Sequence, residues 1–375
     1  MHILITGAAG FIGSHVADAA LAAGHQVRGL DSLPPAVHDA RPAYWPDEAE
    51  LVVGDVRDPL AVDKALDGVD AVCHQAALVG LGVDLSDLPA YSDVNVTGTA
   101  VLLEAMGRRE IPRLVLASSM VVYGEGGYNC PAHGPVRPLA RARQDLSRGR
   151  FEPRCPDCAG ELRTAMVTES APLDPRNAYA VSKVAQEQLA AVWAGMTGGI
   201  AVALRYHNVY GSRMPRDTPY SGVAAIFRSA LEAGRAPRGF EDGAQQRDFV
   251  HAADVAAANL SGLAAGQPGH LRAYNIASGE PHTIGQMAGA LATAFGGPEP
   301  VVTGEFRIGD VRHVVASPAL AGADLGFLAQ TAFSSGMAQF AHARLREPAG
   351  GSQLGPSAEV NRRPLVSVSD PQSRR

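Results

Sequence analysis

The chain has 375 residues, of which 46% are hydrophobic, and its formal net charge is −6 at pH 7. This length accommodates two domains, or one large α/β unit with a smaller appendage. The negative charge and the lack of a long basic run exclude a general nucleic-acid or membrane-surface binder, so we expect a small-molecule enzyme. No apolar segment is long enough for a transmembrane helix, and the N-terminus runs directly into an apolar stretch, which predicts a cytoplasmic protein.

The first motif joins a strand to a helix. His2–Thr6 is a short apolar run typical of a buried parallel strand, and a glycine turn and a helical pattern to about residue 23 follow at once. Backbone N–H groups at a helix N-terminus suit a pyrophosphate, although the spacing is G-x-x-G-x-x-G and a tight turn without ligand is the alternative. The predicted dinucleotide-binding residues here are Gly7, Gly10, Phe11, Ile12 and Gly13.

The carboxylate of Asp31 follows a second strand, where dinucleotide folds bind the ribose hydroxyls. A carboxylate repels a 2′-phosphate, so this position favours NAD over NADP, although Arg28 nearby leaves NADP open. Asp55 follows a third strand at 51–53, and we expect it, with Val56, to contact the adenine; an ordinary loop aspartate is the alternative.

The fourth strand, 71–73, leads into small residues that let the backbone approach a cofactor, and Ala76 is among them. Asn95, within a helix predicted for 89–107, completes the predicted cofactor site. Cys73 and His74 are interpreted as a core thiol and a strand-end histidine rather than as catalytic groups.

Tyr179 and Lys183 lie four residues apart on a predicted helix, so they face the same side. An ammonium near a phenol favours the phenolate and lowers the phenol pKa from about 10, which predicts an acid/base pair. A surface pair is the alternative, because the spacing also occurs by chance. Ser119 ends the strand predicted for 111–118, at the crevice where α/β sheets bind ligands, and either donates to a substrate oxygen or merely ends the strand.

A sixth strand, 200–205, precedes Asn208, and beyond about residue 215 the strand-helix alternation weakens. We interpret this part, with a helix at 221–233 and a brief strand at 272–276, as a smaller substrate lobe. Guanidinium groups suit bidentate phosphate binding, although scattered arginines are usually solvated. The predicted substrate residues of this part of the chain are Asn208, Arg247, Arg307 and Asp310.

Between Tyr123 and Tyr179 lie 55 residues, which is more than a strand-to-helix connection needs and indicates an insertion. It contains two Cys-Pro turns, separated by 21 residues, that present three cysteines and one histidine. This spacing is typical of a closed structural zinc site; a redox pair and unrelated thiols are the alternatives. The predicted zinc ligands are Cys130, His133, Cys155 and Cys158.

Taken together, these motifs resemble the extended short-chain dehydrogenase/reductase family over roughly residues 1–340. The resemblance implies a Rossmann-type doubly wound parallel sheet of seven strands that binds NAD, a smaller C-terminal α/β lobe and a homodimer built on a helix bundle. It also implies Tyr179 as acid/base, Lys183 as its pKa partner and ribose ligand, and Ser119 as donor to the reacting oxygen. Asn208 and Arg247 would hold the nucleotide diphosphate.

The segment after Ser119 narrows the reaction. In the family, 4,6-dehydratases carry an Asp-Glu pair there and decarboxylases a glutamate, whereas this chain has Met120 and Val121, which cannot transfer protons. We therefore expect epimerisation of a nucleotide-diphosphate sugar at C4 through a 4-keto intermediate. The alternatives are an NAD(P)-dependent 4-ketoreductase and a non-catalytic NAD sensor. The Cys/His insertion resembles a subgroup of bacterial epimerases acting on dTDP-6-deoxy sugars such as dTDP-L-rhamnose; a UDP-hexose is the other expected substrate.

The expected organisation follows from these motifs. Residues 1–125 and 169–215 form the NAD-binding unit, 126–168 the zinc insertion, 216–346 mainly the substrate lobe and 347–375 a disordered tail.

Overall fold

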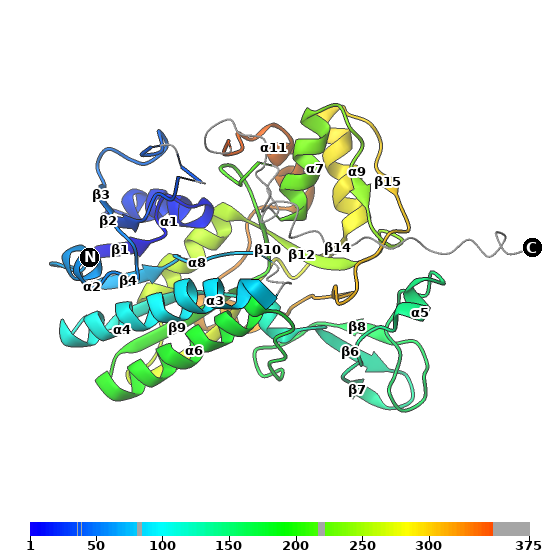
Figure 1. The fold of residues 1–375 in the computed structure, drawn as a ribbon, viewed down its shortest axis with the longest axis horizontal. Coiled ribbons are helices and arrows are strands. Elements are labelled where there is room, and N and C mark those ends of the chain that lie inside the picture. The colour runs from blue at the N-terminus through cyan, green and yellow to red at the C-terminus, as the bar shows by residue number, and fades with distance from the viewer. Residues whose placement is uncertain (36, 39, 81–84, 217–221, 348–375) are drawn as a thin grey trace, which may run out of the picture.

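A computed structural model describes residues 1–347 apart from residues 36, 39, 81–84 and 217–221 (Figure 1). The tail predicted from residue 347 therefore lies, except for Glu347, outside the described residues. None of the helices among the described residues is long and apolar enough to cross a membrane.

The centre of the molecule is a parallel sheet of seven strands in the order β13-β9-β5-β4-β1-β2-β3. This confirms the predicted doubly wound α/β fold. Its strands are β1 (His2–Thr6), β2 (Gln26–Asp31), β3 (Glu50–Val53), β4 (Ala71–His74), β5 (Arg113–Ser119), β9 (Ile200–Tyr206) and β13 (His270–Ile276).

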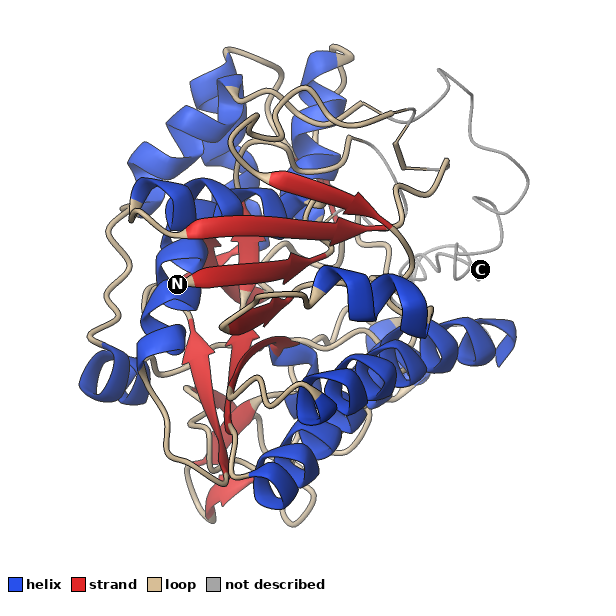
Figure 2. Ribbon diagram, turned by 90° about the vertical axis from the view of Figure 1, so that its left-hand side faces the viewer, coloured by secondary structure: helices blue, strands red, loops and turns tan. Residues whose placement is uncertain are grey.

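Helices cover both faces of this sheet, so its strands are apolar runs without polar alternation (Figure 2). In β1, Ile3 and Ile5 pack in one core and Leu4 in the other. The helices beside the first core are α1 (Phe11–Ala22), α8 (Ala252–Ala264) and α10 (Ala319–Leu325). Those beside the second are α2 (Pro59–Ala65), α4 (Gly98–Arg108) and α6 (Ala178–Thr197).

The helical segment predicted for 89–107 is continuous but not uniform. A 3-10 turn at Leu85–Asp87 leads into α3 (Leu88–Tyr91), a π-helical stretch at Ser92–Thr97 and then α4. Helix α6, which carries Tyr179 and Lys183, begins where the Asn177 side chain accepts a hydrogen bond from the Ala180 N–H at 2.8 Å. Gly198, in the left-handed conformation, ends it.

The smaller lobe lies above the carboxyl ends of the large sheet's strands, at the upper right of Figure 1. Its elements are β10 (Asn208–Tyr210), α7 (Val223–Glu232), β11 (Arg238–Gly239), β12 (Gln246–His251), β14 (Pro281–Thr283), α9 (Ile284–Phe295), β15 (Val301–Val302) and α11 (Phe333–His342). The assignment of the strand at 272–276 to this lobe was wrong: β13 pairs with β9 along seven residues and forms an edge of the large sheet. Pairing with a strand 70 residues away leaves no local sequence signal.

The insertion folds beside the lobe as a three-stranded antiparallel sheet with one short helix, at the lower right of Figure 1. Its elements are β6 (Gly127–Cys130), β7 (Gly134–Val136), α5 (Arg143–Leu146) and β8 (Arg163–Ala165).

Candidate active site

The glycine turn between β1 and α1 is shaped by close backbone approaches. Gly7 has φ +63°, and a Cβ on it would lie 2.7 Å from backbone atoms of Ala76. A Cβ on Gly13 would lie 2.2 Å from the Gly7 carbonyl oxygen. Phe11 and Ile12 form the first turn of α1, which contains no acidic residue to offset the positive end of the helix dipole. The turn thus combines the features that a pyrophosphate requires.

Asp31 lies at the end of β2 and is 8% exposed. Its carboxylate accepts the N–H of Ala9 at 3.0 Å and that of Leu33 at 2.9 Å, so it fixes the glycine turn from the side. A carboxylate has about four acceptor sites, which leaves capacity for ribose hydroxyls. Arg28 is turned away, because its Nε lies 2.6 Å from Glu50 and its Nη1 bonds the carbonyls of residues 65 and 67. Arg28, whose position near Asp31 left NADP as an alternative cofactor, is therefore already paired within the protein.

Asp55 forms an ion pair with Arg57 at 2.6 Å, and this guanidinium also bridges to Asp93. The hydrogen bonds from Arg57, against a smaller opposing effect of burial, hold the pKa of Asp55 below its usual range. Val56 packs against α4 so closely that a Cβ on Gly98 would lie 2.6 Å from it. Asp55 therefore stays ionised at neutral pH. Its side chain is partly exposed just beyond the end of β3, which is an edge strand of the large sheet.

Asn95 differs from its prediction as a direct cofactor contact. It is fully buried, accepts the Leu78 N–H at 2.7 Å, and donates to the Leu78 carbonyl at 3.0 Å and to Ser182 Oγ at 2.8 Å. Its amide therefore ties the loop after β4 to helix α6. Because that loop follows Ala76, Asn95 holds in place the backbone that is predicted to face the cofactor.

Ser119, Tyr179 and Lys183 are brought together at the carboxyl end of the sheet. Ser119 ends β5, and its side chain is close enough to the Tyr179 phenol to lower the pKa of that phenol. Lys183 Nζ lies 5.7 Å from the centroid of the Tyr179 ring and donates to the Ala117 carbonyl at 2.8 Å. The serine and lysine therefore flank the phenol from strand and helix, which is an arrangement suited to proton transfer.

The pKa values correct one expectation. Burial raises the pKa of Tyr179 to about 12, although the hydrogen bond from Ser119 opposes this. Burial also lowers the pKa of Lys183 to about 7, with Glu187 opposing. From the sequence, a full ammonium was expected to lower the phenol pKa, but desolvation is the larger effect on both groups in the ligand-free protein. At neutral pH the phenol is protonated and the lysine is about half charged.

A buried polar network supports Lys183 from one turn further along α6. Glu187 accepts Arg205 Nη2 at 2.8 Å and Nε at 3.0 Å, and it also accepts Ser118 Oγ. Arg205 Nη1 donates to the Tyr123 hydroxyl at 2.8 Å, which in turn donates to Asn275 at 2.7 Å. This chain of bonds fixes α6 against β5, β9 and β13. It therefore fixes the position of Lys183.

Cys73 and His74 are structural, as predicted. Cys73 is fully buried, and burial raises its pKa to about 12. His74 bonds Thr6 at 2.7 Å and Thr99 at 2.9 Å, and burial lowers its pKa to about 3, so it is neutral at the ends of β1 and β4.

His207 was not among the predicted site residues, and the structure makes it a functional candidate. It follows Tyr206, which is paired in register with Ser119. It is 4% exposed, and neither ring nitrogen has a hydrogen-bond partner within the described part of the chain. The Oδ1 of the neighbouring Asn208 is likewise buried and unpaired. Buried polar atoms normally have partners, so adjacent orphans beside Ser119 point to a ligand. The signal available in the sequence was the adjacency to Asn208.

Arg247 differs from its expected role as a phosphate ligand. Its Nη1 donates to the Arg312 carbonyl and its Nη2 to the Val311 carbonyl, both at 2.9 Å. Its terminal nitrogens are therefore committed to the protein backbone. Arg307 instead stacks 4.7 Å from the Phe240 ring, and its buried Nε is unpaired among the described residues. Asp310 accepts Arg141 through its backbone carbonyl.

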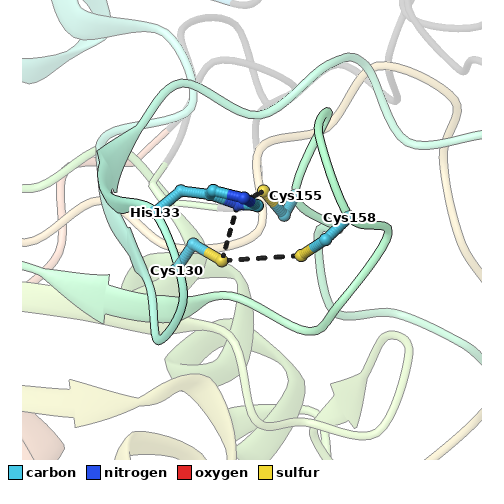
Figure 3. Close-up of side chains that lie close together, drawn as sticks. All are labelled: Cys130, His133, Cys155 and Cys158. Carbon is cyan, nitrogen blue, oxygen red and sulfur yellow. Dashed lines mark hydrogen bonds between the residues drawn. The ribbon is translucent and has the colours of Figure 1, made fainter.

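The four predicted zinc ligands converge from two turns of the insertion (Figure 3). Their ligand atoms all lie within 4.8 Å of one another. Cys130 Sγ is 3.7 Å from Cys158 Sγ and 3.5 Å from His133 Nδ1, which is 3.4 Å from Cys155 Sγ. A disulfide requires about 2.05 Å, and all four cysteines of the chain are free thiols.

The comparison with known proteins agrees with this geometry. The model of the NAD dependent epimerase/dehydratase family matches residues 3–144 and 156–277. A dTDP-L-rhamnose 4-epimerase of Burkholderia thailandensis is 33% identical over 343 residues, covering 90% of this chain and 93% of that protein. A UDP-glucose 4-epimerase of Mycolicibacterium smegmatis is 30% identical over 348 residues, covering 90% of this chain and 97% of that protein.

Solved structures with similar folds include the UDP-glucose 4-epimerase of Thermus thermophilus in complex with NAD. It superimposes with a TM-score of 0.71 at 29% identity, covering 91% of this chain and 98% of that one. The UDP-glucose 4-epimerase of Thermotoga maritima with UDP-glucose gives a TM-score of 0.75 at 25% identity, covering 91% and 97%. By its sequence motifs, its sheet and its relatives, the chain belongs to the NAD dependent epimerase/dehydratase family.

Proposed function

We propose that this protein is an isomerase that inverts C4 of a nucleotide-diphosphate sugar with NAD. The observation that carries the proposal is that Ser119, Tyr179 and Lys183 come together at the carboxyl edge of the sheet, the edge at which the glycine turn also lies. Relatives named as 4-epimerases cover nine-tenths of the chain and support the same reaction. The absence of an acid at Met120 and Val121 disfavours elimination.

In this reaction Tyr179 accepts the proton of the sugar 4-hydroxyl and returns it after the ring has turned over. Ser119 donates a hydrogen bond to the same oxygen, which stabilises it as it changes between alcohol and ketone. When bound, NAD⁺ supplies the hydride acceptor for C4 and a positive charge that favours the Tyr179 phenolate. Lys183 adds to that effect to the extent that it is protonated.

The residues of the glycine turn and Asp31 fit the dinucleotide. The turn excludes any Cβ at Gly7 and Gly13, and the carboxylate of Asp31 has free acceptor capacity toward a ribose. Because Arg28 is paired with Glu50, its guanidinium is not available to a 2′-phosphate, which the carboxylate of Asp31 would repel. NAD is therefore proposed over NADP, which also disfavours an NADPH-dependent ketoreductase.

The substrate is proposed to be a dTDP-6-deoxyhexose or a UDP-hexose. Purified protein with no added cofactor, incubated with dTDP-, UDP- and GDP-sugars, should interconvert one epimer pair. Tyr179→Phe should abolish this interconversion while NAD remains bound, because it removes only the phenolic oxygen. Turnover retained by Tyr179→Phe, or turnover that requires added NADPH, would refute the mechanism.

We also propose that Cys130, His133, Cys155 and Cys158 hold a structural zinc ion. A tetrahedral site with Zn–S of about 2.3 Å and Zn–N of about 2.0–2.1 Å has S···S edges of about 3.8 Å and S···N edges of about 3.5 Å. The corresponding separations here are 3.7 Å and 3.4–3.5 Å. Four protein ligands leave no open position, which favours a structural over a catalytic ion.

Metal analysis tests this assignment. Protein purified without chelators should contain about one zinc ion per chain, and Cys158→Ser should lower that content. The matched control is Cys73→Ala, because Cys73 lies outside the cluster. A zinc content near zero in the unaltered protein would refute the site.

A homodimer is proposed on the outer faces of α4 and α6. The groove between them is lined mainly by apolar side chains, together with Glu104 and Arg108, and Val192 and Met196 are 58% and 82% exposed. Exposed apolar side chains that gather in one place are typical of an interface. Met196→Glu should reduce the mass measured by light scattering, whereas Val302→Glu, at an exposed apolar position in the lobe, should not.

We also propose the division of the chain into NAD-binding, insertion and substrate units, with β13 assigned to the NAD-binding unit because it pairs with β9.

A further inference from the structure

The segment 310–313 lies in the seam between the Cys/His insertion and the smaller lobe. From the side of the insertion, Arg141 Nη2 donates to the Asp310 carbonyl at 2.7 Å, and the Tyr128 hydroxyl accepts the His313 N–H at 3.1 Å. Glu125, just ahead of the insertion, accepts the Arg312 N–H at 3.1 Å. Side chains of the insertion thus hold this backbone at successive residues.

The lobe holds the same segment from the opposite side. Arg247 donates to the carbonyls of Val311 and Arg312, both at 2.9 Å. The Gln246 N–H donates to His313 Nδ1 at 3.0 Å, so this nitrogen carries no proton. His313 Nε2 is therefore the donor toward Glu152 at 2.9 Å. The tautomer of His313 is set by one contact from the lobe and one from the insertion.

Arg312 connects the two sides through its side chain, which is fully buried. Its Nη1 lies 2.8 Å from Glu241 and 2.7 Å from Asp242, which belong to the lobe. Its Nε lies 2.9 Å from Glu152, which belongs to the insertion, and Nη2 bonds the same carboxylate. A buried guanidinium requires ionised partners, so this seam cannot open without exposing charge.

Two of the insertion residues that reach the seam, Tyr128 and Glu152, lie close in sequence to the Cys/His turns. Tyr128 lies two residues before Cys130 and packs in one small core with Cys130 and Cys155. Glu152 lies three residues before Cys155. A further core joins Phe151 of the insertion to Phe306 of the lobe, next to Arg307. Packed side chains therefore connect the two Cys/His turns to residues 306–313.

We propose that the Cys/His insertion positions the segment 307–313 for substrate binding, with Glu152 as the positioning residue that transmits its geometry. This inference rests on the proposed function, because Arg307 and Asp310 are its predicted substrate residues. None of the seam contacts described above involves a residue of the glycine turn between β1 and α1. Disturbing the seam therefore weakens nucleotide-sugar binding while the retention of NAD is unaffected.

The test compares Glu152→Gln with Glu161→Gln, the same change at an exposed position of the same insertion. Calorimetry with dTDP and UDP, and KM and kcat for the sugar that turns over, are measured on purified protein. Glu152→Gln should raise Kd and KM at least tenfold and change kcat less than twofold. Zinc content and NAD content should stay at the wild-type level, and Glu161→Gln should match wild type.

A second variant guards against misfolding. Tyr128→Phe removes only the hydroxyl that accepts the His313 N–H, and it should raise Kd and KM two- to fivefold with kcat unchanged. Equal Kd values for wild type, Glu152→Gln and Tyr128→Phe would overturn the inference. A wild-type protein that binds neither nucleotide would instead refute the proposed function.

Discussion

A methyl group on Gly13 should disable the cofactor turn. The Cβ of Gly13→Ala would lie 2.2 Å from the Gly7 carbonyl oxygen and 3.0 Å from Ala8 Cα, whereas ordinary contact begins at 3.4 Å. Helix α1 would have to move from the turn by about 1 Å. Overpacking of this kind costs about 1–3 kcal/mol. If the same free energy is lost from the binding of NAD to the rearranged turn, the affinity for NAD falls about 5- to 150-fold.

The measurement is the NAD content of protein after gel filtration, followed by titration calorimetry of NAD into stripped protein. Gly289→Ala is the matched control, because Gly289 also lies within a helix, α9, and a Cβ there meets nothing within 4 Å. It should leave NAD binding intact and stabilise the protein by about 0.5–1 kcal/mol. Wild-type NAD content and affinity in Gly13→Ala would refute the assignment of this turn to the cofactor.

Three further predictions concern the buried groups of the site. Glu187→Gln leaves Arg205 without its charged partner and should lower the free energy of unfolding by about 3–5 kcal/mol in denaturant titration. Glu305→Gln, at the surface ion pair with Arg238, should lower it by less than about 1 kcal/mol, and an equally small loss for Glu187→Gln would contradict the network. His207→Phe should raise KM for the nucleotide sugar without lowering the midpoint of thermal unfolding, because the ring nitrogens that it removes have no hydrogen-bond partner among the described residues. A lower midpoint with an unchanged KM would argue against a contact between His207 and the ligand. The pKa of Lys183 falls from 10.5 to about 7 on folding, so the unfolded chain binds more protons between these values. The free energy of unfolding of the cofactor-free protein, measured relative to that of Lys183→Met, should therefore rise between pH 7 and about pH 10 by up to about 1.4 kcal/mol per pH unit. A difference between the two proteins that does not change with pH would contradict the lowered pKa of Lys183.

Much of the fold was predictable because its signals are local. The strand at His2–Thr6 was predicted with the bounds that the structure has, since an apolar run followed by glycine and an amphipathic pattern needs no distant partner. The convergence of Cys130, His133, Cys155 and Cys158 was predictable for a similar reason, because two of these side chains lie on each turn. Ser119 and Tyr179 were predictable as a pair only through the family resemblance.

One assignment could not be made correctly in advance: β13 was placed in the lobe because its pairing with β9 depends on contacts across the sheet. The partners of two predicted ligand contacts were also beyond the sequence. The Asn95 amide bonds Leu78 and Ser182, and the Arg247 guanidinium bonds the carbonyls of residues 311 and 312.

By itself, the sequence determined which chemical groups this protein possesses and the strand or helix that carries each of them. Short-range propensities decide those features. The tertiary structure decided which groups remain available to a ligand, because a buried amide or guanidinium must bond whatever the fold places beside it. The guanidinium groups of Arg28 and Arg247 are bonded within the protein. The ring nitrogens of His207 and the Oδ1 atom of Asn208, by contrast, are buried without a hydrogen-bond partner in the described part of the chain.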